Sequence, residues 1–108
     1  MKGCQLSFYT TLGRKTGGKL LKDWLIEMAR SVGIPGATVF AGLEGYGHDR
    51  RLHSAHFFEL TDEPILVVMV MTEEQKDQLL ARLAAITTEL FYVIHPVQFA
   101  SIGPKGES

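Results

Sequence analysis

Residues 65–75 read ILVVMVMTEEQ and predict two elements of the fold. Residues 65–71 are all apolar and do not alternate with polar residues, which predicts a central strand buried on both faces. Thr72 and Gln75 follow with the spacing of a capping box, in which each side chain satisfies a backbone N–H of the other residue. The apolar positions that come next have helical spacing. The stretch therefore predicts a strand that leads directly into a helix, whose apolar stripe is Leu79, Leu80, Leu83 and Ile86.

The residues before this unit predict a second strand and helix. Residues 5–10 alternate apolar and polar side chains, which is the period of a half-buried strand. Residues 11–19 are polar and rich in glycine and basic residues, so we expect a loop there. From Lys19 to Val32 the apolar residues recur at helical spacing, and Gly33 and Pro35 follow as helix-ending residues.

The remaining segments complete the pattern. Residues 37–44 and 53–60 predict two strands joined by a polar loop, and residues 90–99 predict a final strand in which Pro96 favours an edge position. With residues 53–60 taken as part of an elongated connection between the middle strands, the order β, α, β, β, α, β predicts a ferredoxin-like α+β fold, an antiparallel sheet with both helices on one face. We expect one domain over residues 1–102 and a flexible tail over residues 103–108.

Composition and charge limit the classes of function. The chain has 108 residues, of which 45% are hydrophobic and 21% charged, as in a folded globular domain. A formal net charge of -1 does not favour binding to nucleic acid. The longest apolar run is too short to span a bilayer, and no signal peptide is evident, so we expect a cytoplasmic protein without membrane insertion. The single cysteine, Cys4, is expected in the core of the first strand and unreactive.

No catalytic signature is present: the sequence contains no P-loop, H-E-x-x-H, C-x-x-C or G-x-S-x-G motif. Arg14 and Lys19 are candidates for binding an anion, and Lys19 ranks first because it lies where the first helix begins. His48, His53 and His56 suggest a metal site, since imidazole suits zinc, copper and nickel. In a strand, however, His53 and His56 point to opposite faces, so surface histidines are the favoured interpretation.

The glycines of residues 42–47 have two interpretations. They can form the bulged end of a hairpin, or they can let backbone N–H groups approach a phosphate. Both remain open from the residues alone.

Residues 36–47 read GATVFAGLEGYG, and residues 53–60 read HSAHFFEL. Together with the apolar strand and its capped helix, they resemble the PII-like family catalogued as domain of unknown function 190. The resemblance implies a homotrimer similar to the nitrogen-regulatory PII proteins, which bind adenine nucleotides in clefts between subunits at the base of a loop. On this chain the implied ligand-binding residues are Lys19, Arg14, Glu44, Gly45, Tyr46, Gly47, His48 and His53.

Two departures from PII proteins narrow the expected ligand. His48 and Asp49 stand where PII proteins have an arginine and a glutamine, and residues 86–89 lack the glycine and lysine of their phosphate loop. A nucleotide mono- or diphosphate such as AMP or ADP, or another small anion, is therefore favoured over a triphosphate with magnesium. The resemblance implies a signalling protein rather than an enzyme, which acts through its loop on a partner protein such as a transporter. The alternatives are a divalent-metal-binding trimer, and a small enzyme that acts on a phosphorylated metabolite with His48 or His53 as acid or base.

Overall fold

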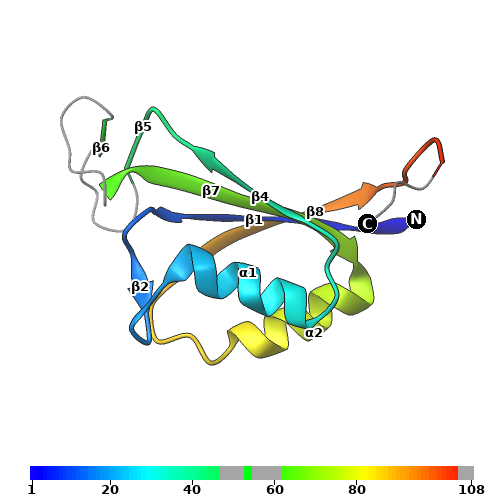
Figure 1. The fold of residues 1–108 in the computed structure, drawn as a ribbon, viewed down its shortest axis with the longest axis horizontal. Coiled ribbons are helices and arrows are strands. Elements are labelled where there is room, and N and C mark those ends of the chain that lie inside the picture. Colours follow the sequence, from blue (N-terminus) through cyan, green and yellow to red (C-terminus); the bar gives the residue numbers. More distant parts are fainter. Residues whose placement is uncertain (47–52, 55–61, 105–108) are drawn as a thin grey trace.

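A computed structural model describes residues 1–46, 53–54 and 62–104, the pair 53–54 by its backbone alone. Four long strands form one antiparallel sheet in the order β4-β7-β1-β8, and two helices lie on one of its faces (Figure 1). With the helices placed after the first and third long strands, this is the ferredoxin-like βαββαβ arrangement, which confirms the predicted fold. The long elements are β1 (Lys2–Thr11), α1 (Leu21–Ser31), β4 (Ala37–Ala41), β7 (Pro64–Thr72), α2 (Glu73–Leu83) and β8 (Phe91–Gln98).

The core lies between the sheet and the helices. β1 and β7 are the central strands, and their inward side chains meet in register, with Leu6 opposite Met69 and Phe8 opposite Val67. These four side chains are almost completely buried. Because side chains alternate along a strand, every second residue of β1 and β7 enters this core. The helices contribute their buried stripes, Leu21, Leu25 and Ala29 from α1 and Leu79 and Leu83 from α2.

The predicted capping box at the start of α2 is confirmed. The Thr72 hydroxyl accepts from the Gln75 N–H at 3.1 Å, and the Gln75 side-chain oxygen accepts from the Thr72 N–H at 3.0 Å. Gln75 also donates its side-chain amide to the carbonyl of Gly33, 3.1 Å away, just past the end of α1. The capping residue of one helix therefore also fixes the end of the other. Gly33 has a φ of 80°, as expected for a glycine that ends a helix.

The prediction that β7 is central is confirmed, but the prediction that both of its faces are buried is wrong for the single chain. Burial alternates along the strand: Val67 and Met69 are buried, whereas Leu66, Val68 and Val70 are only half-buried. The physical reason is that both helices lie on the same face of the sheet (Figure 1). The apolar side chains of the other face are left open.

Three further predictions need correction or lie beyond the described residues. The expected loop over residues 11–19 contains a small hairpin of β2 (Lys15–Thr16) and β3 (Lys19–Leu20). The strand expected over residues 37–44 stops at Ala41 and resumes as β5 (Glu44–Gly45). Of the strand expected over residues 53–60, the described part is β6 (His53–Ser54).

The edges of the sheet agree with the sequence. β8 is an edge strand, as Pro96 predicts, because a proline cannot donate to a second neighbouring strand. No helix among the described residues is both long enough and apolar enough to cross a membrane.

Gly3 tests how tightly β1 fits beside β7. A Cβ atom added at Gly3 would collide with the backbone carbonyl of Met71 and lie 2.7 Å from a ring carbon of Phe99. We expect Gly3→Ala to lower the free energy of unfolding by about 1–3 kcal/mol, the usual cost of overpacking. Gly36→Ala is the matched control, because nothing lies within 4 Å of a Cβ at that position. Urea denaturation measures both; equal midpoints for the two variants would contradict the packing described for Gly3.

Cys4 lies fully buried in the core, as the sequence predicts. Burial raises the pKa of its thiol, and the nearby carboxylate of Glu73 raises it further. Because the thiolate is the reactive form, we expect the native protein to react with a thiol reagent at least about a hundredfold more slowly than the urea-unfolded chain. Labelling of the native protein at the unfolded rate, at the same pH, would contradict this placement.

Candidate functional site

Gly42 marks the point where the edge strand β4 leaves the sheet. Its N–H donates to the carbonyl of Pro64 at 2.7 Å. A Cβ at this position would lie 3.2 Å from Pro64 Cγ and 3.3 Å from Pro64 O, which is tighter than ordinary packing. At Gly42 the geometry therefore favours the structural interpretation, a close approach of backbone to backbone.

Gly45 is different. A Cβ there would lie 3.6 Å from Pro64 Cβ, an ordinary contact, and its φ is not in the left-handed region. Neither packing nor conformation requires a glycine at this position. The absence of a side chain does leave the backbone of β5 accessible, which is what a close approach by an anionic group would need.

The two strands of the β5–β6 ribbon lie at the beginning and the end of the predicted ligand loop. Glu44 pairs with Ser54 and Gly45 with His53. Glu44 is exposed, and Tyr46 is 74% exposed at the point where the described chain stops. Gly47 and His48 lie outside the described residues, as does the side chain of His53.

Arg14 comes to this same end of the sheet. Thr11 pairs with Pro64, the residue on which Gly42 packs, and the Leu12 N–H donates to the Glu63 carbonyl at 2.8 Å. The chain then turns, with the Arg14 N–H donating to the Thr11 carbonyl at 3.3 Å. The half-buried Arg14 and the base of the loop are therefore held at one end of the sheet, where β2 and β5 are drawn in Figure 1.

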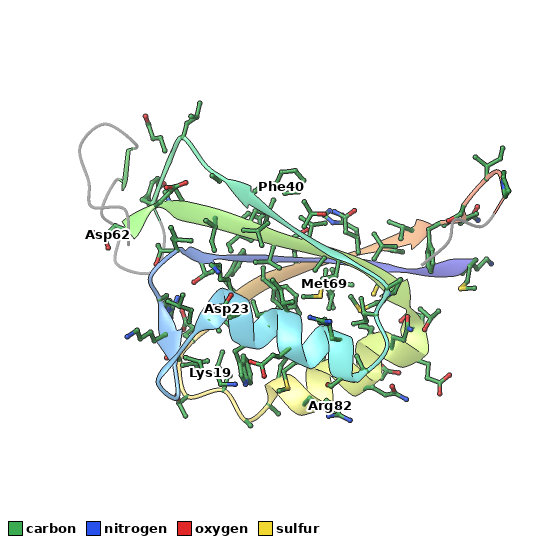
Figure 2. The ribbon with its side chains drawn as sticks, viewed as in Figure 1. Lys19, Asp23, Phe40, Asp62, Met69 and Arg82 are labelled. Atoms are coloured by element: carbon green, nitrogen blue, oxygen red, sulfur yellow. The ribbon has the colours of Figure 1, made fainter. Side chains whose placement is uncertain are left out.

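Lys19 has a different position. It lies just before α1 as predicted, but its ammonium contacts the Glu27 carboxylate at 2.8 Å, two helical turns further along. Figure 2 draws Lys19 beside the helices and Asp62 at the end of the sheet. The first turn of α1 has no side-chain cap and carries Asp23. The structure thus places the backbone of Arg14 at the same end of the sheet as the loop base, and it holds the Lys19 side chain against α1.

A threonine cluster that the sequence analysis did not single out joins the hairpin to the α2–β8 connection. The Thr16 hydroxyl lies 3.1 Å from that of Thr87 and accepts from the Thr87 N–H at 3.3 Å. Thr88 donates its hydroxyl to the Lys15 carbonyl at 3.2 Å. The signal for this hairpin is the pair Gly17-Gly18, whose φ values of 55° and 82° suit the tight turn between two strands. The Thr87 N–H and the hydroxyls of Thr87 and Thr88 thus form hydrogen bonds within the chain.

The metal hypothesis gains no support from the described part of the chain. No group of three or more His, Cys, Asp or Glu side chains that could hold a metal ion occurs within it. The histidines that suggested the site, His48, His53 and His56, have side chains outside the described residues.

Solved structures share this fold. The chain is similar to CPII from Thiomonas intermedia K12, a nitrogen regulatory PII-like protein determined bound to ADP, AMP and bicarbonate, with a TM-score of 0.67 at 16% identity over 93% of this chain and 97% of that one. It is also similar to a protein of Thermus thermophilus described as PII-like signaling, with a TM-score of 0.66 at 16% identity over 90% of this chain and 88% of that one. At such identities the likeness shows the fold.

Sequence relatives show the family. The chain is 32% identical to the UPF0166 protein of Aquifex aeolicus (strain VF5) over 71 residues, which is 66% of this chain and 68% of that protein. The family model DUF190, described as an uncharacterized ACR, matches residues 3–99. The chain therefore belongs to the DUF190 family and has a PII-like fold.

Proposed function

We propose that this protein is a PII-like regulatory protein, a homotrimer that binds an adenine nucleotide, AMP or ADP, between its subunits and acts through its loop on a partner protein. The observation that carries the proposal is the loop base. The edge strand β4 leads into the β5–β6 ribbon at the end of the sheet where Arg14 lies. The fold is that of CPII, which has been determined with ADP and AMP bound. That likeness supports this class of ligand for the chain.

The open face of the sheet supports the trimer. Phe40 and Tyr9 are 52% and 46% exposed, and Phe91 is 62% exposed. Figure 2 shows Phe40 on the side of the sheet away from the helices and Met69 on the side toward them. A sheet face that exposes large apolar residues and that the helices leave uncovered is stabilised by a second layer, which another copy of the chain supplies. Burial of these open faces against one another would bring the subunits together.

The trimer has a direct test. We expect light scattering at micromolar concentration to give a mass of about 36 kDa, three times the 12.0 kDa chain. Val68→Glu places a charge on the open face and should give a folded monomer, since a buried unpaired carboxylate is strongly disfavoured. Gln78→Glu, at an exposed position of α2, is the matched control and should remain trimeric. A monomeric wild-type protein would overturn the trimer and the site between subunits.

Among the cations that the structure describes, Arg14 is the candidate for the nucleotide phosphates, because its backbone lies at the end of the sheet where the loop begins. It is half-buried at the loop base, and a guanidinium recognises phosphate oxygens through paired N–H groups. Lys19 is a weaker candidate, because a phosphate would have to compete with Glu27 for its ammonium. The accessible backbone of Gly45 offers the second element of such a site.

The loop base also offers contacts for a partner protein. Leu43 is 84% exposed and Tyr46 74% exposed, on either side of β5. Tyrosine is enriched among the residues that contribute most to binding at protein interfaces, so Tyr46 is the better anchor of the two, and Leu43 adds apolar surface. A nucleotide bound beside them could alter how they are presented, and a transporter is the class of partner that the family resemblance suggests.

Calorimetry with ADP and AMP tests the nucleotide site. We expect both nucleotides to bind the wild-type protein, and Arg14→Ala to weaken binding by about 1–3 kcal/mol, the range for hydrogen bonds to charged groups. Lys19→Ala, the matched loss of a positive charge, should weaken binding less because Lys19 is paired with Glu27. Gly47→Val should abolish binding if the backbone at that position approaches the phosphate. Absence of binding to the wild-type protein would defeat the proposal in its nucleotide form and leave the fold assignment intact.

The same set of variants separates the nucleotide from the metal. For a metal-binding trimer, titration with zinc or copper should show binding that His48→Ala and His53→Ala abolish, because imidazoles would be the ligands. Arg14→Ala and Lys19→Ala should then have no effect.

A further inference from the structure

The open face of the sheet carries no Asp, Glu, Lys or Arg among the described residues of the four long strands. The residues that belong to this face follow from the pairing of the strands and from the alternation of side chains along each strand. A protein surface is usually about a quarter charged, so an uncharged face of this extent is typical of a contact surface. The residues of this face are Gly3, Gln5, Ser7, Tyr9 and Thr11 of β1, Thr38 and Phe40 of β4, Pro64, Leu66, Val68, Val70 and Thr72 of β7, and Phe91, Val93, His95 and Val97 of β8.

His95 is the member of this face whose side-chain type changes charge near neutral pH. It is exposed in the single chain and lies directly opposite Gln5 on β1. Its neighbours along β8 on the same face, Val93 and Val97, are half-buried and apolar. The side-chain amide of Gln5 donates to the Ser7 hydroxyl, 3.5 Å away.

The charged and titratable groups near His95 do not compensate a positive charge on it. Tyr9 lies on the same face but at the other end of the β1–β8 ladder, opposite Phe91. Lys2 pairs with Gln98, whose side chain belongs to the opposite face, and the Met1 ammonium donates to the Phe99 carbonyl at 2.8 Å. Both of these groups are cations. No carboxylate of the described strands faces His95.

We propose that His95 makes assembly of the trimer sensitive to acid: the trimer forms while this imidazole is neutral and dissociates when it is protonated. The inference rests on the proposed trimer and on burial of the open face within it. A neutral imidazole can enter an apolar interface, whereas an imidazolium without a carboxylate partner loses its hydration there and gains nothing in return. Three subunits bring three such charges into the assembly.

The direction of the effect follows from proton linkage. Because the trimer disfavours the charged form, the separated subunits bind more protons than the assembled ones. Assembly is therefore strongest while these imidazoles are neutral and weakens as the pH falls and they become protonated.

The oligomeric state of the full chain measured at pH 7.5 and pH 5.5 tests this inference. We expect the wild-type protein to need at least about a tenfold higher concentration for half-assembly at pH 5.5 than at pH 7.5. His95→Gln, which is neutral at both values, should assemble equally well at both. His95→Lys should be largely dissociated at pH 7.5, and circular dichroism should show that it remains folded.

The outcomes distinguish the switch from the trimer itself. A wild-type trimer that is equally stable at both pH values overturns the switch and leaves the trimer standing. Acid dissociation of His95→Gln to the same extent as the wild type also overturns it, because another group, such as one of the remaining histidines, would then be responsible. A wild-type monomer at pH 7.5 overturns the proposed trimer and the switch with it.

Discussion

The rest of the structure depends on the pairing of β1 with β7, two apolar strands at the centre of a sheet whose own helices cover one face. The inward residues of these strands are buried against α1 and α2, and they form the core. The outward residues Leu66, Val68 and Val70 of β7 are also apolar, whereas those of β1 are mostly polar but uncharged, and neither helix covers them (Figure 1). One side of the ladder therefore explains why the chain folds, and the other explains why we expect it to associate. Hydrophobic burial is not directional, so the same driving force acts on both faces.

The ends of the central strands determine where the candidate site lies. Pro64 begins β7, receives the N–H of Gly42, and pairs with Thr11 of β1. The edge strand, the loop that follows it and the turn that carries Arg14 are thereby held at one end of the sheet (Figure 1). Loops at the end of a rigid sheet are common places for binding sites, because the scaffold fixes their bases while leaving their residues accessible. The threonine contacts between Thr16 and Thr87 fix the hairpin beneath this end to the last connection of the chain.

Much of the fold could be predicted because its signals are local. The Thr72–Gln75 capping box, the glycine after α1 and the proline in β8 each reflect the backbone of a few neighbouring residues. The hairpin over residues 15–20 was missed although its Gly17-Gly18 turn is also a local signal, because strands of two residues show no periodicity. Less of the site could be predicted. The sequence ranks Lys19 above Arg14 as an anion-binding residue, but in the folded chain the Lys19 ammonium is paired with the Glu27 carboxylate. That ion pair depends on the position of Glu27 on the folded helix, which the ranking did not consider.

By itself, the sequence determined the order of the elements, the capping of α2, the apolar character of both faces of β7 and the family to which the chain belongs. These are properties of local spacing and side-chain type, which the chain carries before it folds. Only the tertiary structure shows that Gly42 is crowded by Pro64 whereas Gly45 has room, and that His95 lies on an uncharged face opposite Gln5. Each of these depends on the register between strands far apart in the sequence. A shift of one residue in that register would move every side chain to the other face.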